Sequence, residues 1–169
     1  GIRDDLVTGV QTCALPISDV ERLANITFAE VMDYFGYDPE LYEVSLLACD
    51  DSRIAGLNGE FRAKNTATNV LSWPSVERGP TDSGGFPRAL DPIHDEFLGD
   101  IALAYETCCR EADSGAKLFS DHVNHLMVHG LLHLMGFDHE TDADATVMER
   151  IETEILGKMG INAPYTEYE

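Results

Sequence analysis

Three histidines near the end of the sequence have the spacing of a metal site: His129, His133 and His139. A spacing of four puts His129 and His133 on one face of a helix, one turn apart. Gly136 can take the left-handed conformation that ends a helix, so that His139 meets the other two from outside it. Three converging imidazoles are typical zinc ligands and leave a fourth position for water. The spacing therefore predicts one metal ion per chain, with Zn2+ as the first choice and nickel, copper and iron as alternatives that accept the same ligands.

The pattern H-x-x-x-H-x-x-G-x-x-H is also the ligand pattern of metzincin proteases. Those enzymes need Glu directly after the first histidine, where it acts as general base on the zinc-bound water. The corresponding residue here is Gly130. The sequence keeps the ligands without the protease base, so a zinc-dependent hydrolase or peptidase remains only as an alternative.

Other histidines are weaker candidates. His125 lies four residues before His129, and we expect it to be exposed or packed, with a fourth ligand or a ligand partner as alternatives. His122 shares the same helix, and its role is open. His94 lies in a loop beside Asp95, where a lone histidine is usually a solvated side chain.

The run HGLLHLMGFDHE, residues 129–140, closely resembles the signature of the YbeY family, bacterial metal-dependent endoribonucleases that mature ribosomal RNA. Two further matches, at residues 57–74 and 97–103, occur in family order. The resemblance covers about residues 44–161. The departures leave the three histidines untouched: Asn65, Ala67 and Asn69 stand where the family has Asp, Pro and Asp.

The resemblance implies a catalytic role for Arg62. A guanidinium binds phosphate in a bidentate manner and neutralises charge that develops during phosphoryl transfer. Lys64 is a weaker candidate for contact with the RNA backbone. Ser72 is not a candidate nucleophile, because no histidine and acid pair accompanies it in the sequence.

The family resemblance implies a zinc-dependent endoribonuclease that prefers single strands, processes the 3′ end of 16S ribosomal RNA and acts in ribosome quality control. Its expected partners are ribosomal RNA, the small ribosomal subunit and ribosomal proteins. A ribosome assembly factor with mainly structural zinc is a second alternative. The nucleophile, either a water or the neighbouring ribose hydroxyl, stays open, and so does the oligomeric state.

Composition limits the function further. With 11 basic and 31 acidic residues the formal charge is −20, which opposes general coating of nucleic acid. Cleavage of RNA then requires a cleft that is locally positive. No apolar run reaches the length of a membrane span, so we expect no membrane partner. The four cysteines lack the pattern of a secreted disulfide framework, and we expect reduced thiols in a cytoplasmic protein.

Periodicity predicts the elements that position these residues. Helices are expected at 19–35, 51–61 and 105–113, followed by a long helix capped by Ser120 that carries the metal motif, and a last helix capped by Thr141 or Asp142 and ended by Gly157 or Gly160. Strands are expected at 43–49, 69–73 and 97–104, with a loop over 75–95. The pattern predicts an α+β fold, a single mixed β-sheet covered by helices, with a buried central helix carrying the metal motif.

We expect one folded unit, the endoribonuclease domain at residues 19–161. Residues 1–18 do not resemble the rest, and the stretch 7–17 looks like a translated sequencing adapter. That segment is therefore expected to be foreign or disordered. Residues 162–169 are polar and are expected to fray.

Overall fold

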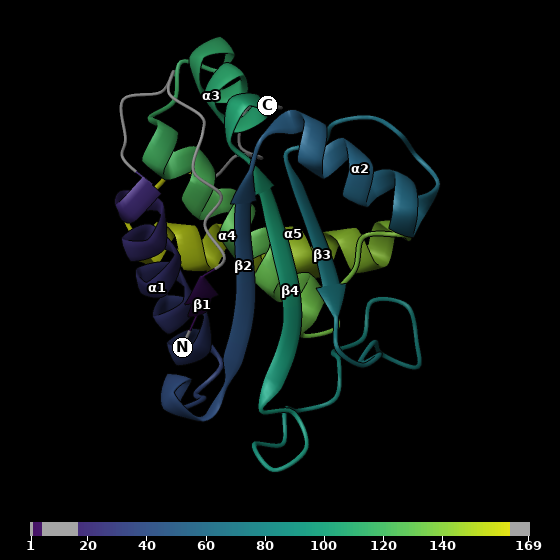
Figure 1. The fold of residues 1–169 in the computed structure, drawn as a ribbon. Coiled ribbons are helices and arrows are strands. Elements are labelled where there is room, and N and C mark those ends of the chain that lie inside the picture. Colours follow the sequence, from purple (N-terminus) through teal and green to yellow (C-terminus); the bar gives the residue numbers. More distant parts are fainter. Residues whose placement is uncertain (1, 5–16, 163–169) are drawn as a thin grey trace.

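The computed structural model describes residues 2–4 and 17–162, in which helices cover both faces of one β-sheet (Figure 1). Its helices are α1 (Ile17–Tyr34), η1 (Pro39–Leu41, a 3-10 turn), α2 (Asp51–Arg62), α3 (Tyr105–Ser114), α4 (Phe119–Leu134) and α5 (Asp142–Lys158). Its strands are β1 (Ile2–Asp4), β2 (Glu43–Cys49), β3 (Val70–Pro74) and β4 (Phe97–Ala104).

The sheet is mixed and has the strand order β1-β2-β4-β3. Strands β1, β2 and β4 are parallel, whereas β3 runs antiparallel to β4. Along β2 every second side chain is buried, at Val44, Leu46 and Ala48, as the alternation in the sequence predicts. β4 lies between β2 and β3, and most of its residues are buried, which suits a strand covered on both faces.

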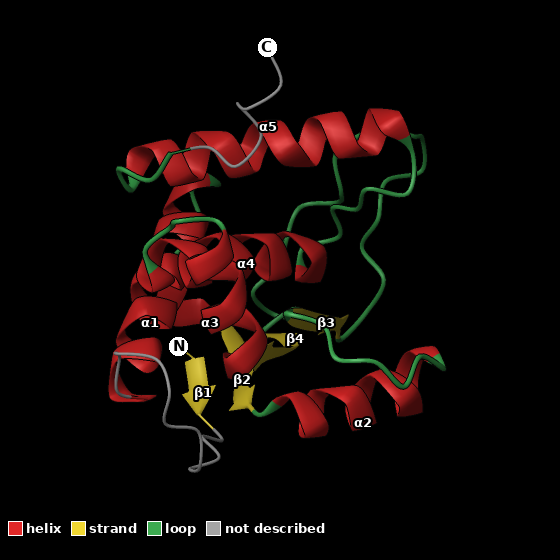
Figure 2. Cartoon of the chain, turned by 90° about the horizontal axis from the view of Figure 1, so that it is seen from above, coloured by secondary structure: helices red, strands yellow, loops and turns green. Residues whose placement is uncertain are grey.

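Helix α4 is the central helix of the fold. Figure 2 shows α2 on one face of the sheet, and α4 between the other face and α5. Nine of its sixteen residues are buried, because it packs against the sheet, α1, α3 and α5 at once. The predicted fold class, a mixed sheet covered by helices around a buried metal-motif helix, is confirmed.

Most predicted boundaries agree with the structure within two residues, but some caps differ. The N-cap of α4 is Leu118 and makes no side-chain cap hydrogen bond, so Ser120 lies inside the helix. The helix starts earlier because Phe119 packs against Tyr105 of α3. Thr141 does cap α5, and its hydroxyl accepts from the Asp144 amide. Gly157 lies within α5, whereas Gly160 after its end has φ +74°.

The N-terminal segment expected to be foreign is described only in part. Residues 2–4 form β1 beside Val44–Leu46 of β2, and residues 17 and 18 begin α1. Residues 1, 5–16 and 163–169 lie outside the described residues. The foreign origin of the segment stays a prediction.

The described residues also bear on the membrane and cysteine expectations. Within residues 2–4 and 17–162, no helix combines the length and apolar character that a membrane crossing requires. Among the described residues, Cys49 and Cys108 carry free, buried thiols, as expected.

Candidate metal centre

The three predicted histidines converge at the end of α4. His129 and His133 lie on consecutive turns of the helix, and His139 reaches them from the turn that follows. The Nε2 atom of His133 lies 3.0 Å from that of His129 and 3.2 Å from that of His139. Ligand nitrogens around tetrahedral zinc lie about 3.3 Å apart, given zinc–nitrogen bonds of about 2.05 Å. The cluster therefore fits a single small divalent ion.

The turn after α4 is what brings His139 back to the helix. Gly136 has φ +102°, a conformation that side-chain-bearing residues rarely adopt, and the Phe137 amide donates to the carbonyl of Leu132. The Asp138 carboxylate then accepts from the backbone amide of His139 at 2.7 Å. Asp138 thus stabilises the turn itself.

Hydrogen bonds to the opposite ring nitrogens prepare two of these histidines for a cation. The Nδ1 of His133 lies 3.0 Å from the Phe137 carbonyl, and the Nδ1 of His129 lies 2.6 Å from an oxygen of Glu152. A carbonyl oxygen and an ionised carboxylate only accept, and with these acceptors each Nδ1 carries the proton and each Nε2 keeps its lone pair. Burial, and then the neighbouring His129 and His139, lower the pKa of His133 to about 4. Its imidazole is therefore neutral at pH 7, the form that binds metals.

Sequence reasoning missed Glu152, a fully buried carboxylate on α5. Its second oxygen lies 3.2 Å from Nε2 of His125, so His125 faces Glu152 and does not belong to the triad. The sequence did contain a pattern that could have identified Glu152, because this acid falls on the same face of α5 as Met148, Ile151 and Ile155. An acid within an apolar helical stripe indicates a buried partner.

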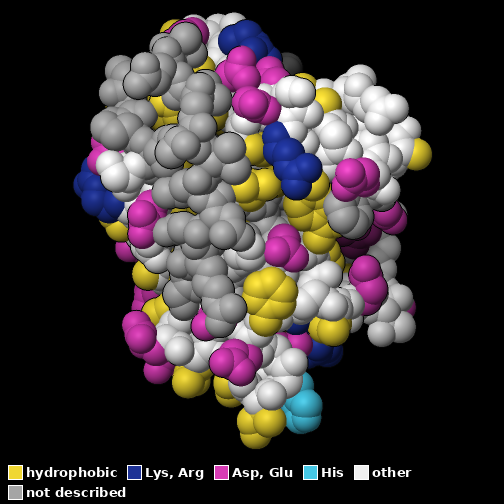
Figure 3. Space-filling model, viewed as in Figure 1, with side chains coloured by type: hydrophobic (Ala, Val, Ile, Leu, Met, Phe, Trp, Pro, Cys, Tyr) yellow, Lys and Arg dark blue, Asp and Glu magenta, His cyan; other side chains and the backbone are white. Residues whose placement is uncertain are grey.

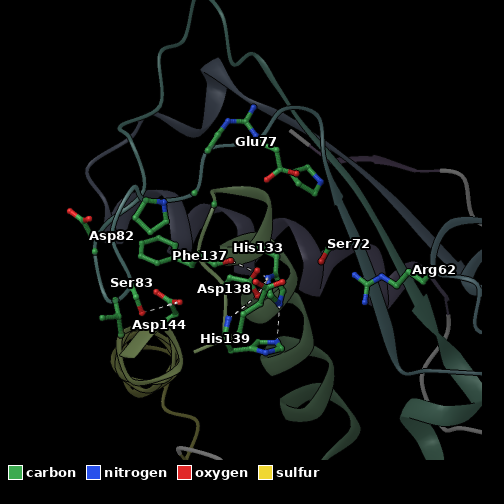
Figure 4. A pocket seen from close by; sticks show the side chains of 18 residues that line it. Arg62, Ser72, Glu77, Asp82, Ser83, His133, Phe137, Asp138, His139 and Asp144 are labelled. Atoms are coloured by element: carbon green, nitrogen blue, oxygen red, sulfur yellow. Dashed lines mark hydrogen bonds and ion pairs between the residues drawn. The ribbon is translucent and has the colours of Figure 1, made fainter. Parts of the chain in front are cut away.

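Two of the histidines, His133 and His139, line a pocket of about 600 Å3 that is shared with Arg62 and Ser72. In Figure 4 Arg62 lies on one side of the pocket with its guanidinium pointing toward the histidines, and Ser83 and Asp144 lie on the other. Arg62 ends α2, where Ala63 adopts a left-handed conformation. Its side chain is exposed and has no ion-pair partner among residues 2–4 and 17–162. The guanidinium is available to an anion.

The loop predicted at 75–95 forms the far wall of this pocket, and Arg78 anchors it. The buried guanidinium donates to the carbonyl of Leu134 at 2.9 Å, near the end of α4, and to the Asp95 carboxylate at 3.0 Å. Arg88 donates to both oxygens of Asp95, and these bonds, with those from Arg78, hold the pKa of Asp95 well below its usual range. The loop is therefore held against the helix that carries the metal motif.

The remaining candidates lie outside the centre. Lys64 is exposed and does not line the pocket. His94 is exposed and pairs with Asp91, not with its neighbour Asp95. His122 contacts Glu111 of α3 at 2.7 Å. These placements agree with structural or solvated roles for the two histidines.

Gly130 occupies the position of the protease base, and the packing explains why it is glycine. A Cβ atom there would lie 3.2 Å from Cδ1 of Ile101 on β4, so the position faces the sheet. A Glu side chain would start toward this packed core. The position of the protease base therefore carries no acid, and a side chain there would require Ile101 to move by a few tenths of an ångström.

The face of the molecule drawn in Figure 3 shows no broad cationic patch outside its grey area. On the part of the molecule that Figure 3 shows outside its grey area, acidic side chains are scattered and basic ones do not gather into a patch. The pocket itself also has acidic lining residues, namely Glu77, Asp82, Glu140 and Asp144. Among the described lining residues, the arginines are Arg62 and Arg78, and Arg78 is committed to Asp95.

Comparisons with known proteins identify the family of this chain. The family model described as "Endoribonuclease YbeY" matches residues 9–160. An endoribonuclease YbeY of Jannaschia sp. is 52% identical over 147 residues, covering 87% of this chain and 91% of the relative. One from Ruegeria pomeroyi is 53% identical over 146 residues, covering 85% and 88%. A solution structure from Thermotoga maritima, with 18% identity, shares the fold with a TM-score of 0.55 over 95% of this chain and 92% of that one.

The family match spans nearly the whole chain, and the relatives are about half identical over most of their own length. Their shared activity requires an RNA substrate, and the histidine triad supplies a candidate metal site. The chain therefore belongs to the YbeY family and is a metal-dependent endoribonuclease.

Proposed function

We propose that the enzyme is a zinc-dependent endoribonuclease that cleaves single-stranded ribosomal RNA, in maturation of the 16S 3′ end and in ribosome quality control. The zinc ligands are His129, His133 and His139. The observation that carries the proposal is the convergence of three histidine ligand nitrogens, two of whose residues, His133 and His139, line a pocket shared with Arg62, which makes no ion pair with the described part of the chain. Family membership supports zinc and ribosomal RNA as the metal and the substrate.

The metal, its ligands and Arg62 have separate roles in the proposed reaction. When bound, zinc would act as a Lewis acid toward the scissile phosphate or lower the pKa of a water. The Phe137 carbonyl and Glu152 hold the rings of His133 and His129 so that their Nε2 atoms face the centre. Arg62 binds the phosphate and neutralises the charge that develops on its oxygens.

The acidic surface favours a short, local RNA contact. A protein of formal charge −20 gains little from long-range attraction to phosphates. A single strand can place one phosphate in the pocket, whereas a duplex brings many more phosphates near acidic side chains. The same acidic exterior suits basic ribosomal proteins as partners in the cytoplasm.

Metal analysis of untagged protein tests the ligand set. We expect about one zinc per chain in the wild type, and a loss of zinc together with RNA cleavage in His133→Ala. Circular dichroism checks that the variant is folded. A folded, zinc-free variant that cleaves a single-stranded rRNA fragment at the wild-type rate would refute the metal assignment. If the variant is unfolded and the wild type never cleaves, zinc is structural and the assembly-factor alternative holds.

Arg62 is tested separately from the metal. Arg62→Ala should keep its zinc and lose about 100- to 1000-fold in kcat, the usual effect of removing a group that stabilises transition-state charge. Arg53→Ala is the matched control, because Arg53 lies on the same helix, is exposed and does not line the pocket. Equal rates in the two variants would contradict a catalytic role for Arg62.

The products identify the nucleophile. A cyclic phosphate at the new 3′ end means that the neighbouring ribose hydroxyl attacked, whereas a linear phosphate from the outset means that water attacked. A peptidase screen of the same preparation tests the alternative hydrolase activity, and we expect it to be negative because Gly130 faces Ile101.

A further inference from the structure

Glu152 is a fully buried acid directly behind the metal centre. It projects from α5 toward α4, and each of its two oxygens lies against an imidazole of that helix. Oε1 lies 2.6 Å from Nδ1 of His129, and Oε2 lies 3.2 Å from Nε2 of His125. The carboxylate therefore links one member of the triad to a histidine one turn earlier on the same helix.

We propose that Glu152 is the positioning residue of the metal centre, braced by His125, and that it sets the tautomer, the orientation and the donor strength of His129. This inference rests on the proposed metal site. It assigns no contact between Glu152 and the metal or the RNA, because the imidazole of His129 lies between them.

Tautomer control follows from the donor and acceptor chemistry. An ionised carboxylate only accepts, so the 2.6 Å contact requires the proton of His129 on Nδ1. The Nε2 lone pair, 3.0 Å from Nε2 of His133, is then available to a cation. The other tautomer would place a proton between these nitrogens and block the centre.

Orientation follows from the two-sided contact. A carboxylate held at one oxygen can rotate about its last bond, whereas contacts at both oxygens fix its plane. The plane of the carboxylate in turn limits rotation of the His129 ring. His125 thereby gains a role that its spacing alone did not reveal, as a support for the carboxylate and not as a fourth ligand.

Donor strength is an electrostatic effect. A buried negative charge on one side of an imidazole raises the electron density at the opposite nitrogen, and low surrounding polarity strengthens the effect. His133 instead donates to the Phe137 carbonyl, a neutral acceptor. His129 should therefore be the ligand whose strength depends most on its partner.

Glu152→Gln is the informative variant, because it keeps the shape of the side chain and one acceptor while it removes the charge and the second acceptor. Glu149→Gln is its control: the same charge change on the same helix, at an exposed position. We would remove metal with a chelator, then titrate zinc against a chromophoric competitor. Loss of a carboxylate partner of a ligand histidine typically weakens metal binding about 10- to 100-fold. We expect that loss in Glu152→Gln and wild-type affinity in Glu149→Gln.

Thermal unfolding of the metal-free variants separates positioning from folding. The proposal expects metal-free Glu152→Gln to fold cooperatively, so that its weaker zinc binding reflects the site. Wild-type zinc affinity in Glu152→Gln would overturn the proposal, and so would a metal-free variant that does not fold. If the wild type itself binds no zinc, the proposed metal site is refuted. If the wild type binds zinc and Glu152→Gln binds it equally well, only the role of Glu152 is refuted.

Discussion

The buried ion pair between Arg78 and Asp95 makes the sharpest prediction about stability. Asp95 is 1% exposed, and it accepts from Nε of Arg78 at 3.0 Å, from Arg88 at 2.6 and 2.9 Å, and from the Asp91 amide at 2.9 Å. The substitution Asp95→Asn removes the negative charge and replaces one acceptor by a donor. The Arg78 guanidinium, which is fully buried, then keeps its charge without a counterion at this position.

The size of the loss follows from that unpaired charge. Removing one partner of a buried ion pair costs about 3–5 kcal/mol. Asparagine retains one oxygen that can accept from Arg78 or Arg88, so we expect the lower end, about 3 kcal/mol. With a urea m-value of about 2 kcal/mol/M, the unfolding midpoint should fall by about 1.5 M.

Urea unfolding at pH 7 in the presence of a chelator measures this loss without a contribution from bound metal. The control is Asp82→Asn, an exposed position of the same loop, which should stay within about 0.5 kcal/mol of the wild type. A loss below about 1 kcal/mol for Asp95→Asn, with an unchanged m-value, would refute the reasoning. It would mean that Arg78 finds another anion or water, and that the pair does not hold the loop.

Three further outcomes follow from the same structure. Hydrogen bonds from Arg88 and Arg78 lower the pKa of Asp95, so the contribution of its charge to folding stability is complete above about pH 4, the usual carboxylate pKa, and is lost as the pH falls further. The difference in free energy of unfolding between the wild type and Asp95→Asn should therefore narrow below pH 4, in unfolding curves taken from pH 7 to 2.5. Gly136→Ala should lower the free energy of unfolding in urea by about 2–4 kcal/mol and weaken zinc binding, because residue 136 has φ +102° and its Cβ would lie 2.7 Å from the Arg78 carbonyl carbon. Wild-type stability and wild-type zinc affinity in this variant would contradict the role given to Gly136 in the turn. Gly130→Glu restores the metzincin pattern, but it should lower the free energy of unfolding by at least about 3 kcal/mol and give no peptidase activity, because the new side chain points toward Ile101. A stable variant with peptidase activity would show that position 130 faces the pocket.

The sequence was most informative where function depends on local spacing. The four-residue interval between His129 and His133 is a property of any helix, and Gly136 indicated where that helix ends and turns. Strand β2 was predicted at its observed limits because the alternation of buried and partly exposed residues is visible in the sequence. Arg62 became a candidate through the family motif, and the structure places it at the pocket that holds His133 and His139.

Errors arose where a short-range rule competed with packing. Ser120 is a good capping residue, but α4 starts at Phe119 because an aromatic contact with Tyr105 stabilises an earlier turn. The loop 75–95 was correctly predicted as irregular from its glycines and prolines. Its role as a pocket wall depends on Arg78, whose partners at Asp95 and Leu134 lie 17 and 56 residues away.

The sequence by itself determined which side chains can bind a metal, because ligand type and helical spacing are local properties. Only the tertiary structure decided what surrounds them. Glu152 reaches His129 across the α4–α5 contact, 23 residues along the chain, and one side of the pocket is lined by a loop from before β4. Such partners are brought together by burial of apolar helix faces, which fixes layers and distances that no local pattern encodes.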